Sequence, residues 1–160
     1  MSISVGDRMP EGNLVTMTGD DPDSISSAEL FGGKKVVLFS VPGAFTPTCS
    51  AKHLPGYVQH AADLRARGID KIACMAVNDV FVMDAWGKSG NVGDAVLMLA
   101  DGNGDYTRAL GLSLDASGFG MGQRGQRFAL VVDDGVVSQV HVEAPGEFRV
   151  SAAEAVLENL

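Results

Sequence analysis

The stretch "KKVVLFSVPGAFTPTC", residues 34–49, decides how this chain folds. Its first half, 34–41, is a continuous apolar run rich in β-branched residues, which predicts a strand buried on both faces of a sheet. Pro42 ends that strand, because proline cannot donate a hydrogen bond to a neighbouring strand. Apolar residues then recur every three or four positions over 54–64, which predicts a helix that ends at Gly68. The stretch is therefore the start of a β-α-β unit.

The same alternation continues along the rest of the chain and predicts the fold class. Patterning indicates further strands at 71–78 and 95–101, a hairpin over 127–143, and helices at 79–90, 105–112 and 151–160. This order predicts an α/β, thioredoxin-like fold, with a central mixed β-sheet flanked by helices on both faces. We expect a single domain over residues 1–160, since the chain shows no repeat and no linker-like segment.

Three local features give more detailed expectations. Pro55 lies early in the helix of 54–68 and predicts a kink or a broken first turn. Ser151 and Glu154 have the spacing of a capping box at the start of the last helix. Segment 113–126, "SLDASGFGMGQRGQ", is rich in glycine and is expected to form an irregular loop.

Composition excludes several classes of protein. The formal net charge is −8, with lysine and arginine scattered, so we expect neither nucleic acid nor an anionic membrane as a partner. No apolar run approaches the roughly 18 residues of a membrane span, and residues 1–13 lack the pattern of a secretory signal. Two cysteines cannot form the disulfide framework of a small secreted domain. The expectation is a cytoplasmic protein with reduced thiols.

One of the two cysteines has the setting of a reactive thiol. Cys49 falls where a strand has ended and a helix begins, and the free N–H groups of a helix start favour a thiolate. Thr46 is placed to cap the turn or to donate its hydroxyl to an oxygen bound beside the sulfur. Pro42 and Pro47 stiffen the backbone and limit access of water. An inert buried cysteine is the alternative, and this setting favours a nucleophile.

The sequence around Cys49 resembles that of a known protein family. "PGAFTPTC" followed by "SAKHLPGY" (42–57) is similar to the active-site segment of peroxiredoxins, in the type II (atypical two-cysteine) branch. The short pattern P-x-x-x-T-x-x-C marks peroxiredoxins generally, whereas the longer wording is far more specific. The resemblance continues over nearly the whole chain, through "VNDVFVMDAWG" (77–87), "LADGNGDYTRALGL" (99–112), "RFALVVDDG" (127–135) and "GEFRVSAAE" (146–154).

This resemblance implies a thiol peroxidase that needs neither a metal nor an organic cofactor. It implies that Cys49 is the peroxidatic cysteine, which attacks the O–O bond of hydrogen peroxide or an alkyl hydroperoxide and becomes a sulfenic acid. Thr46 matches the threonine that orients the peroxide, and Pro42 matches the proline that shields the site. Arg127 matches an arginine on a distant strand. A guanidinium there stabilises both the thiolate and the negative charge that develops on the departing oxygen.

Two other residues near this motif have alternative roles. Arg124 is a rival to Arg127, and we favour Arg127 because a strand aims its side chain more steadily than a loop. His53 lies one helical turn after Cys49, so the two share a face. A Cys–His hydrolase dyad, or a metal site that includes His60, is a weaker interpretation than a histidine that packs or forms hydrogen bonds near the active site.

The second cysteine leaves the reductant open. Cys74 lies in the apolar run 71–78 and is either a core residue or a resolving cysteine, as some type II relatives are thought to use it. The branch's other resolving position, near the C-terminus, is occupied here by Val150. Two routes therefore remain: an intramolecular Cys49–Cys74 disulfide, or reduction of Cys49 by an outside thiol such as glutathione with glutaredoxin, or by thioredoxin. The disulfide would require the helix start to unwind.

Further expectations concern assembly and alternative functions. The resemblance implies a homodimer, and the turns 42–48, 79–86 and 113–123 carry apolar residues suited to its interface: Phe45, Phe81 and Phe119. A peroxide-sensing redox signalling protein that uses the same cysteine is the alternative function. A thioredoxin-like binding domain without turnover is a third, and the complete set of four site residues favours the enzyme.

Overall fold

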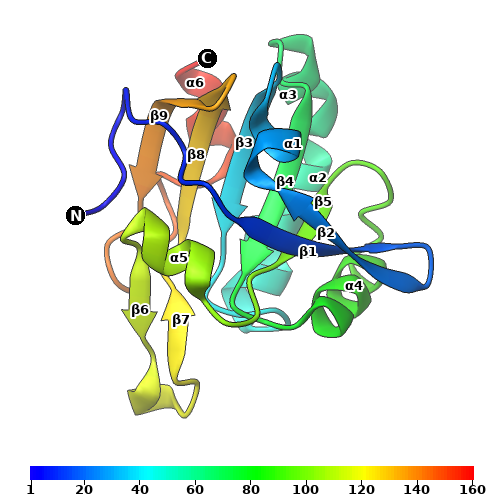
Figure 1. Ribbon diagram of the computed structural model, residues 1–160, viewed down its shortest axis with the longest axis vertical. Helices are drawn as coiled ribbons and strands as arrows, with labels where there is room; N and C mark the ends of the chain where they lie inside the picture. Colours follow the sequence, from blue (N-terminus) through cyan, green and yellow to red (C-terminus); the bar gives the residue numbers. More distant parts are fainter.

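The strand predicted at 34–41 lies inside a seven-stranded mixed sheet in the computed structural model, which describes residues 1–160 (Figure 1). In sheet order the strands are β2 (Asp21–Ser26), β1 (Asn13–Thr18), β5 (Leu97–Ala100), β4 (Lys71–Ala76), β3 (Lys35–Ser40), β8 (Phe128–Asp133) and β9 (Val136–Val142). Strands β5, β4 and β3 are parallel, and the remaining pairings are antiparallel.

Helices cover both faces of this sheet (Figure 1). They are α1 (Ser27–Phe31), α2 (Leu54–Gln59), α3 (Ala61–Ala66), α4 (Val80–Ser89), α5 (Asp105–Leu110) and α6 (Ala153–Glu158). The buried residues of α2, α3, α4 and α6 pack in one core layer, and those of α1 and α5 pack in the other. No helix is both long enough and apolar enough to cross a membrane.

The apolar run of β3 explains why two layers form. Successive side chains of a strand point to opposite faces. Val37 and Phe39 therefore join the layer under α2 and α3, whereas Val36 and Leu38 join the layer under α1 and α5. All four are fully buried. The predicted thioredoxin-like α/β fold, with a mixed sheet flanked by helices, is confirmed.

The helix predicted over 54–68 is irregular in its first turns. A π-helical turn, η1 (Cys49–His53), precedes α2, and the Leu54 N–H donates to the Cys49 carbonyl. Pro55 lies in the first turn of α2. Its ring crowds the carbonyl four residues earlier and removes one N–H, which widens the preceding turn. A second interruption at His60 separates α2 from α3.

Two local predictions are wrong. Segment 113–126 is a short hairpin rather than an irregular loop: β6 (Ser113–Asp115) pairs with β7 (Gln123–Gly125), and a 3₁₀ turn, η2 (Ser117–Phe119), lies between them. Glycines with positive φ, at Gly120 and Gly122, allow the chain to reverse there. The predicted capping box is also absent, because the last helix begins at Ala153 with Ala152 as its N-cap.

The N-terminal hairpin carries no strong sequence signal and was not predicted. Strand β1 pairs with both β2 and β5, so this hairpin closes one edge of the sheet. Helix α1 follows it, and its capping box is formed by Ser26 and Glu29.

Candidate active site

The segment that follows β3 places Cys49 in the first turn of a helix. Helical backbone begins at Pro47, and the Ser50 N–H donates to the Thr46 carbonyl at 2.9 Å. The π-helical turn then starts at Cys49 itself. First-turn N–H groups carry partial positive charge, so this position favours a thiolate. A π-helical turn of this kind recurs at functional sites in proteins.

The loop between β3 and Cys49 is held in an unusual shape. Phe45 has φ of +64°, a conformation that a bulky side chain rarely adopts. The Ala44 N–H donates to Asn78 Oδ1 at 3.0 Å, which ties the loop to the end of β4. Thr46 Oγ1 donates to the Gly43 carbonyl at 2.7 Å. With its proton directed at Gly43, the Thr46 oxygen keeps lone pairs free to accept a hydrogen bond, while half-buried Pro42 lies at the start of the loop.

Arg127 is the arginine that the fold brings to the cysteine. It lies directly before β8, and its Nη2 donates to Cys49 Sγ at 3.1 Å. Its Nη1 donates to His53 Nδ1 at 2.9 Å. The rival Arg124 instead donates to two backbone carbonyls, from Nε to Met121 at 2.9 Å and from Nη1 to Val77 at 3.3 Å. Arg124 therefore ties the β6–β7 hairpin to the end of β4.

His53 is a neutral hydrogen-bonding residue in this arrangement. A guanidinium can only donate, so Nδ1 is the acceptor and the ring proton lies on Nε2, which donates to the Ser151 carbonyl at 3.1 Å. Burial, and after it the charge of Arg127, lowers the pKa of His53 from 6.5 to about 3. This is the supporting role expected from the sequence, and it orients Arg127.

Aromatic rings surround His53 and Arg127. The His53 ring centroid lies 4.9 Å from that of Phe39 and 5.0 Å from that of Phe148. Arg127 Cζ lies 5.8 Å from the centroid of the Phe148 ring. Cys49 is 0% exposed and Arg127 is half-buried, so the sulfur and the guanidinium interact partly shielded from bulk water. A charge contact in such surroundings is stronger than one at the surface.

The comparisons with known proteins agree with this geometry. The sequence model of the Redoxin family matches residues 4–157. Peroxiredoxin-2E-2 of Oryza sativa subsp. japonica, a chloroplastic protein, is 50% identical over 99% of this chain and 73% of its own length. Peroxiredoxin-2B of Arabidopsis thaliana is 48% identical over 99% of this chain and 98% of its own. The chain belongs to the peroxiredoxins.

A solved structure supports the same assignment for this peroxiredoxin. Reduced Prx3 of Vibrio vulnificus in complex with H₂O₂ is 51% identical, with a TM-score of 0.94 over 98% of both chains. The predicted relation to the type II branch is confirmed by these relatives. The chain is thus a thiol-dependent peroxidase with a thioredoxin-like fold.

Cys74 of this peroxiredoxin is a core residue of the central sheet. It lies in β4, opposite Phe39 of β3 and Met98 of β5, and is 0% exposed. Burial, and to a smaller degree the neighbouring Cys49, raises the pKa of the Cys74 thiol. Both cysteines are free and belong to the same core layer. Arg127 contacts Cys49 and has no corresponding contact with Cys74.

Sequence reasoning missed the residues that support His53. The Ser151 carbonyl accepts hydrogen bonds from both His53 Nε2 and Tyr57 Oη, the latter at 2.7 Å. The Ser151 side chain does not cap α6 and instead donates to Glu143 Oε2 at 2.6 Å. A buried carboxylate outcompetes the helix terminus for this hydroxyl. Glu154, the other member of the predicted box, pairs with His60 Nε2 at 3.0 Å.

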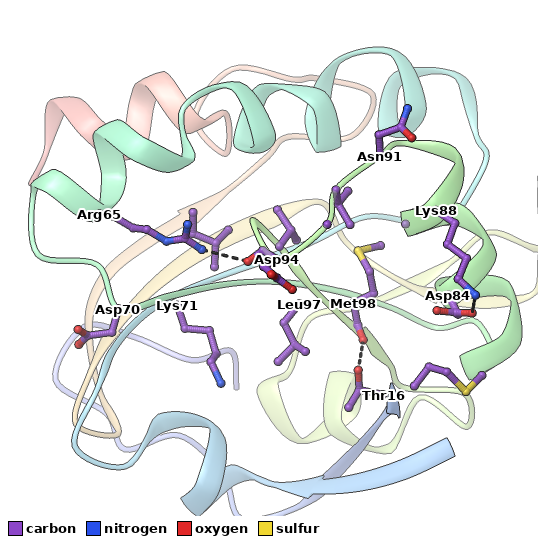
Figure 2. Close-up of a pocket in the computed structure, with 16 residues that line it drawn as sticks. Thr16, Arg65, Asp70, Lys71, Asp84, Lys88, Asn91, Asp94, Leu97 and Met98 are labelled. Carbon is purple, nitrogen blue, oxygen red and sulfur yellow. Dashed lines mark hydrogen bonds and ion pairs between the residues drawn. The ribbon is translucent and has the colours of Figure 1, made fainter. Parts of the chain in front are cut away.

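A large cavity lies away from this site. It has a volume of about 780 Å³ and is bordered by β1, β4, β5, the end of α3 and the end of α4. Figure 2 shows charged side chains around it, with Lys88 paired to Asp84 and Arg65 reaching the backbone of Asp94. None of the four predicted catalytic residues lines it. No cluster of three or more histidine, cysteine or acidic residues is placed to hold a metal ion.

Proposed function

We propose that Cys49 is the peroxidatic nucleophile of this thiol peroxidase. The observation that carries the proposal is the 3.1 Å hydrogen bond from Arg127 Nη2 to Cys49 Sγ. The thiolate attacks one oxygen of a hydroperoxide, the S–O bond forms and the O–O bond breaks. Cys49 becomes a sulfenic acid, and the departing oxygen takes up a proton to give water or an alcohol.

The neighbouring residues act on the charges of this step. Arg127 holds the thiolate and then the negative charge that moves onto the departing oxygen, because its fixed fork presents several donors at once. Thr46 Oγ1 accepts a hydrogen bond from the peroxide hydroxyl, since its own proton is held by Gly43. Pro42 limits the access of water to the sulfur. Hydrogen peroxide and alkyl hydroperoxides are the proposed substrates.

We propose that an outside thiol, glutathione acting with glutaredoxin, reduces Cys49. The thiol attacks the sulfenic sulfur, releases water and leaves a mixed disulfide; a second thiol then releases Cys49 as a disulfide forms between the two reductants. The burial of Cys74 inside β4 supports this route, because its thiol is held protonated and its sulfur is covered by neighbouring strands. Val150 leaves no second cysteine to resolve Cys49 from the C-terminal segment.

Mass spectrometry tests the reductant. After one equivalent of peroxide, we expect wild-type protein and Cys74→Ser to gain one oxygen or, with glutathione present, one glutathione. A loss of two hydrogens in wild type that is absent in Cys74→Ser would show the intramolecular disulfide and contradict the proposal. Peroxide-dependent NADPH consumption is expected with glutathione and glutaredoxin. Faster turnover with thioredoxin alone would contradict this proposal and identify thioredoxin as the reductant. Oxidation without turnover by any donor would favour the peroxide sensor.

We also propose that the protein works as a homodimer in the cytoplasm. The apolar residues expected at the interface support the dimer, because Phe45, Phe81 and Phe119 are 54%, 63% and 86% exposed. The loop after β3 and the start of α4 both follow carboxyl ends of parallel strands, so they lie at one end of the sheet (Figure 1). Sedimentation of wild type and Phe119→Asp tests it, and a monomeric wild type at micromolar concentration would contradict it.

A further inference from the structure

Glu143 holds two segments of the active site from one position. It directly follows β9, and its backbone N–H donates to the Arg127 carbonyl at 3.0 Å. Its side-chain Oε2 accepts hydrogen bonds from Arg149 N at 2.8 Å, Ser151 N at 2.8 Å and Ser151 Oγ at 2.6 Å. Glu143 is only 7% exposed, so these donors replace its water. A buried carboxylate with three donors is fixed in one orientation.

A closed ring of hydrogen bonds returns from Glu143 to Arg127. Ser151, held by the Glu143 carboxylate, presents its carbonyl to His53 Nε2 at 3.1 Å. His53 Nδ1 accepts Arg127 Nη1 at 2.9 Å, and Arg127 Nη2 reaches Cys49 Sγ. The Tyr57 hydroxyl also donates to the Ser151 carbonyl. Arg127 is thus held at its backbone by Glu143 directly, and at its guanidinium by Glu143 through Ser151 and His53.

We propose that Glu143 is a positioning residue for the peroxidase reaction, which aligns the Arg127 guanidinium with Cys49 through Ser151 and His53. The inference rests on the proposed role of Cys49 and Arg127. The reaction needs the guanidinium at hydrogen-bond distance from both the sulfur and the departing oxygen, and a misplacement of about 1 Å can cost about 100-fold in rate. No other carboxylate has a hydrogen bond to this ring.

The charge state of Glu143 agrees with this role. Burial acts to raise its pKa, and hydrogen bonds from Ser151, Arg149 and Val150 outweigh that effect, so the pKa is lowered. The carboxylate is therefore ionised at neutral pH and accepts all of its donors. A neutral amide in its place offers one oxygen to the same donors but carries no charge, so each of these hydrogen bonds becomes weaker.

Three variants test the proposal. Glu143→Gln keeps the shape of the side chain and removes its charge, and Ser151→Ala removes the hydroxyl but keeps the carbonyl that holds His53. Glu147→Gln is the matched control, because Glu147 lies in the same segment, is 44% exposed in its side chain, and has a carboxylate that pairs with Arg149 at 3.9 Å. The rate of Cys49 oxidation by hydrogen peroxide is measured by stopped flow, together with the pH profile of Cys49 alkylation by iodoacetamide.

We expect Glu143→Gln to lower the oxidation rate by about 10- to 100-fold and to move the alkylation profile to higher pH. Ser151→Ala should show a smaller loss of about three- to tenfold, and Glu147→Gln none. The proposal would be overturned if both test variants kept the wild-type oxidation rate and alkylation profile and showed only a lower melting temperature. Glu143 would then have a purely structural role. Peptide mapping of the alkylated wild type separates this outcome from failure of the proposed function, in which Cys49 is not the reactive cysteine.

Discussion

At Arg127, a single guanidinium divides its donors between a sulfur and an imidazole. Lysine carries the same charge, but its compact ammonium cannot reach Cys49 and His53 at the same time in a fixed plane. Arg127→Lys should therefore lower the rate of Cys49 oxidation by about 100-fold, as expected for the loss of a donor aimed at developing charge. Stopped-flow kinetics with hydrogen peroxide measure this loss. Arg108→Lys, on the exposed side of α5, is the matched substitution and should keep the wild-type rate; near-normal activity of Arg127→Lys would sink the assignment.

Residues differ in how far the sequence alone reveals them. Pro42, Thr46 and Cys49 lie in one contiguous motif, and Arg127 is recognisable by its flanking sequence, so all four are predictable from the sequence. Glu143 could not, because its partners are backbone N–H groups and a hydroxyl six and eight residues away, across an exposed turn. No local pattern encodes that contact. It depends on how β9 and α6 meet in the folded molecule.

At the scale of elements, the π-helical turn depends on a contact from another helix. Trp86 of α4 donates from Nε1 to Ser50 Oγ at 3.0 Å, directly beside Cys49. Ser50→Ala leaves this indole N–H without its partner, so the free energy of unfolding should fall by about 1 kcal/mol. Urea unfolding followed by Trp86 fluorescence measures it, since this is the only tryptophan of the chain.

The control for this contact lies on the same helix. Ser89 of α4 is exposed and its hydroxyl has no partner, so Ser89→Ala should leave the stability unchanged or slightly higher. Equal stability of Ser50→Ala and Ser89→Ala would mean that the indole contact contributes nothing to the turn. The native fluorescence of Ser50→Ala should also differ from wild type, because the environment of the indole N–H changes.

Elements with long apolar runs were predictable, and those built on glycine or on polar turns were not. Strands β3, β4 and β8 are buried on both faces, so their sequences are almost wholly apolar. The β6–β7 hairpin has three residues in each strand and little to bury, so its glycine-rich sequence predicts a loop instead. The π-helical turn likewise carries only an indirect signal, the proline that follows it.

At the scale of the whole molecule, acid should unfold the protein through its buried histidine. The pKa of His53 is lowered to about 3 by burial first and then by Arg127, so the folded state excludes a proton that the unfolded chain binds below pH 6.5. The stability due to neutral His53 is fully present above pH 6.5 and is lost as the pH falls toward 3. The expected slope approaches 1.4 kcal/mol per pH unit. His141, whose pKa burial also lowers, adds to it.

Urea unfolding at several pH values between 6.5 and 4.5 tests this dependence, because the lowered pKa of Glu143 restricts its own contribution to lower pH. His53→Asn should have lower stability at neutral pH and a clearly flatter slope, and His141→Gln should flatten it less. An unchanged slope in His53→Asn would mean that other groups carry the acid sensitivity. The ring of hydrogen bonds around Arg127 depends on the same neutral imidazole, which the folded state keeps down to a pH near 3. Stability should therefore fall between pH 6.5 and 4.5 before protonation of His53 disturbs the ring and lowers the peroxidase rate of the folded protein.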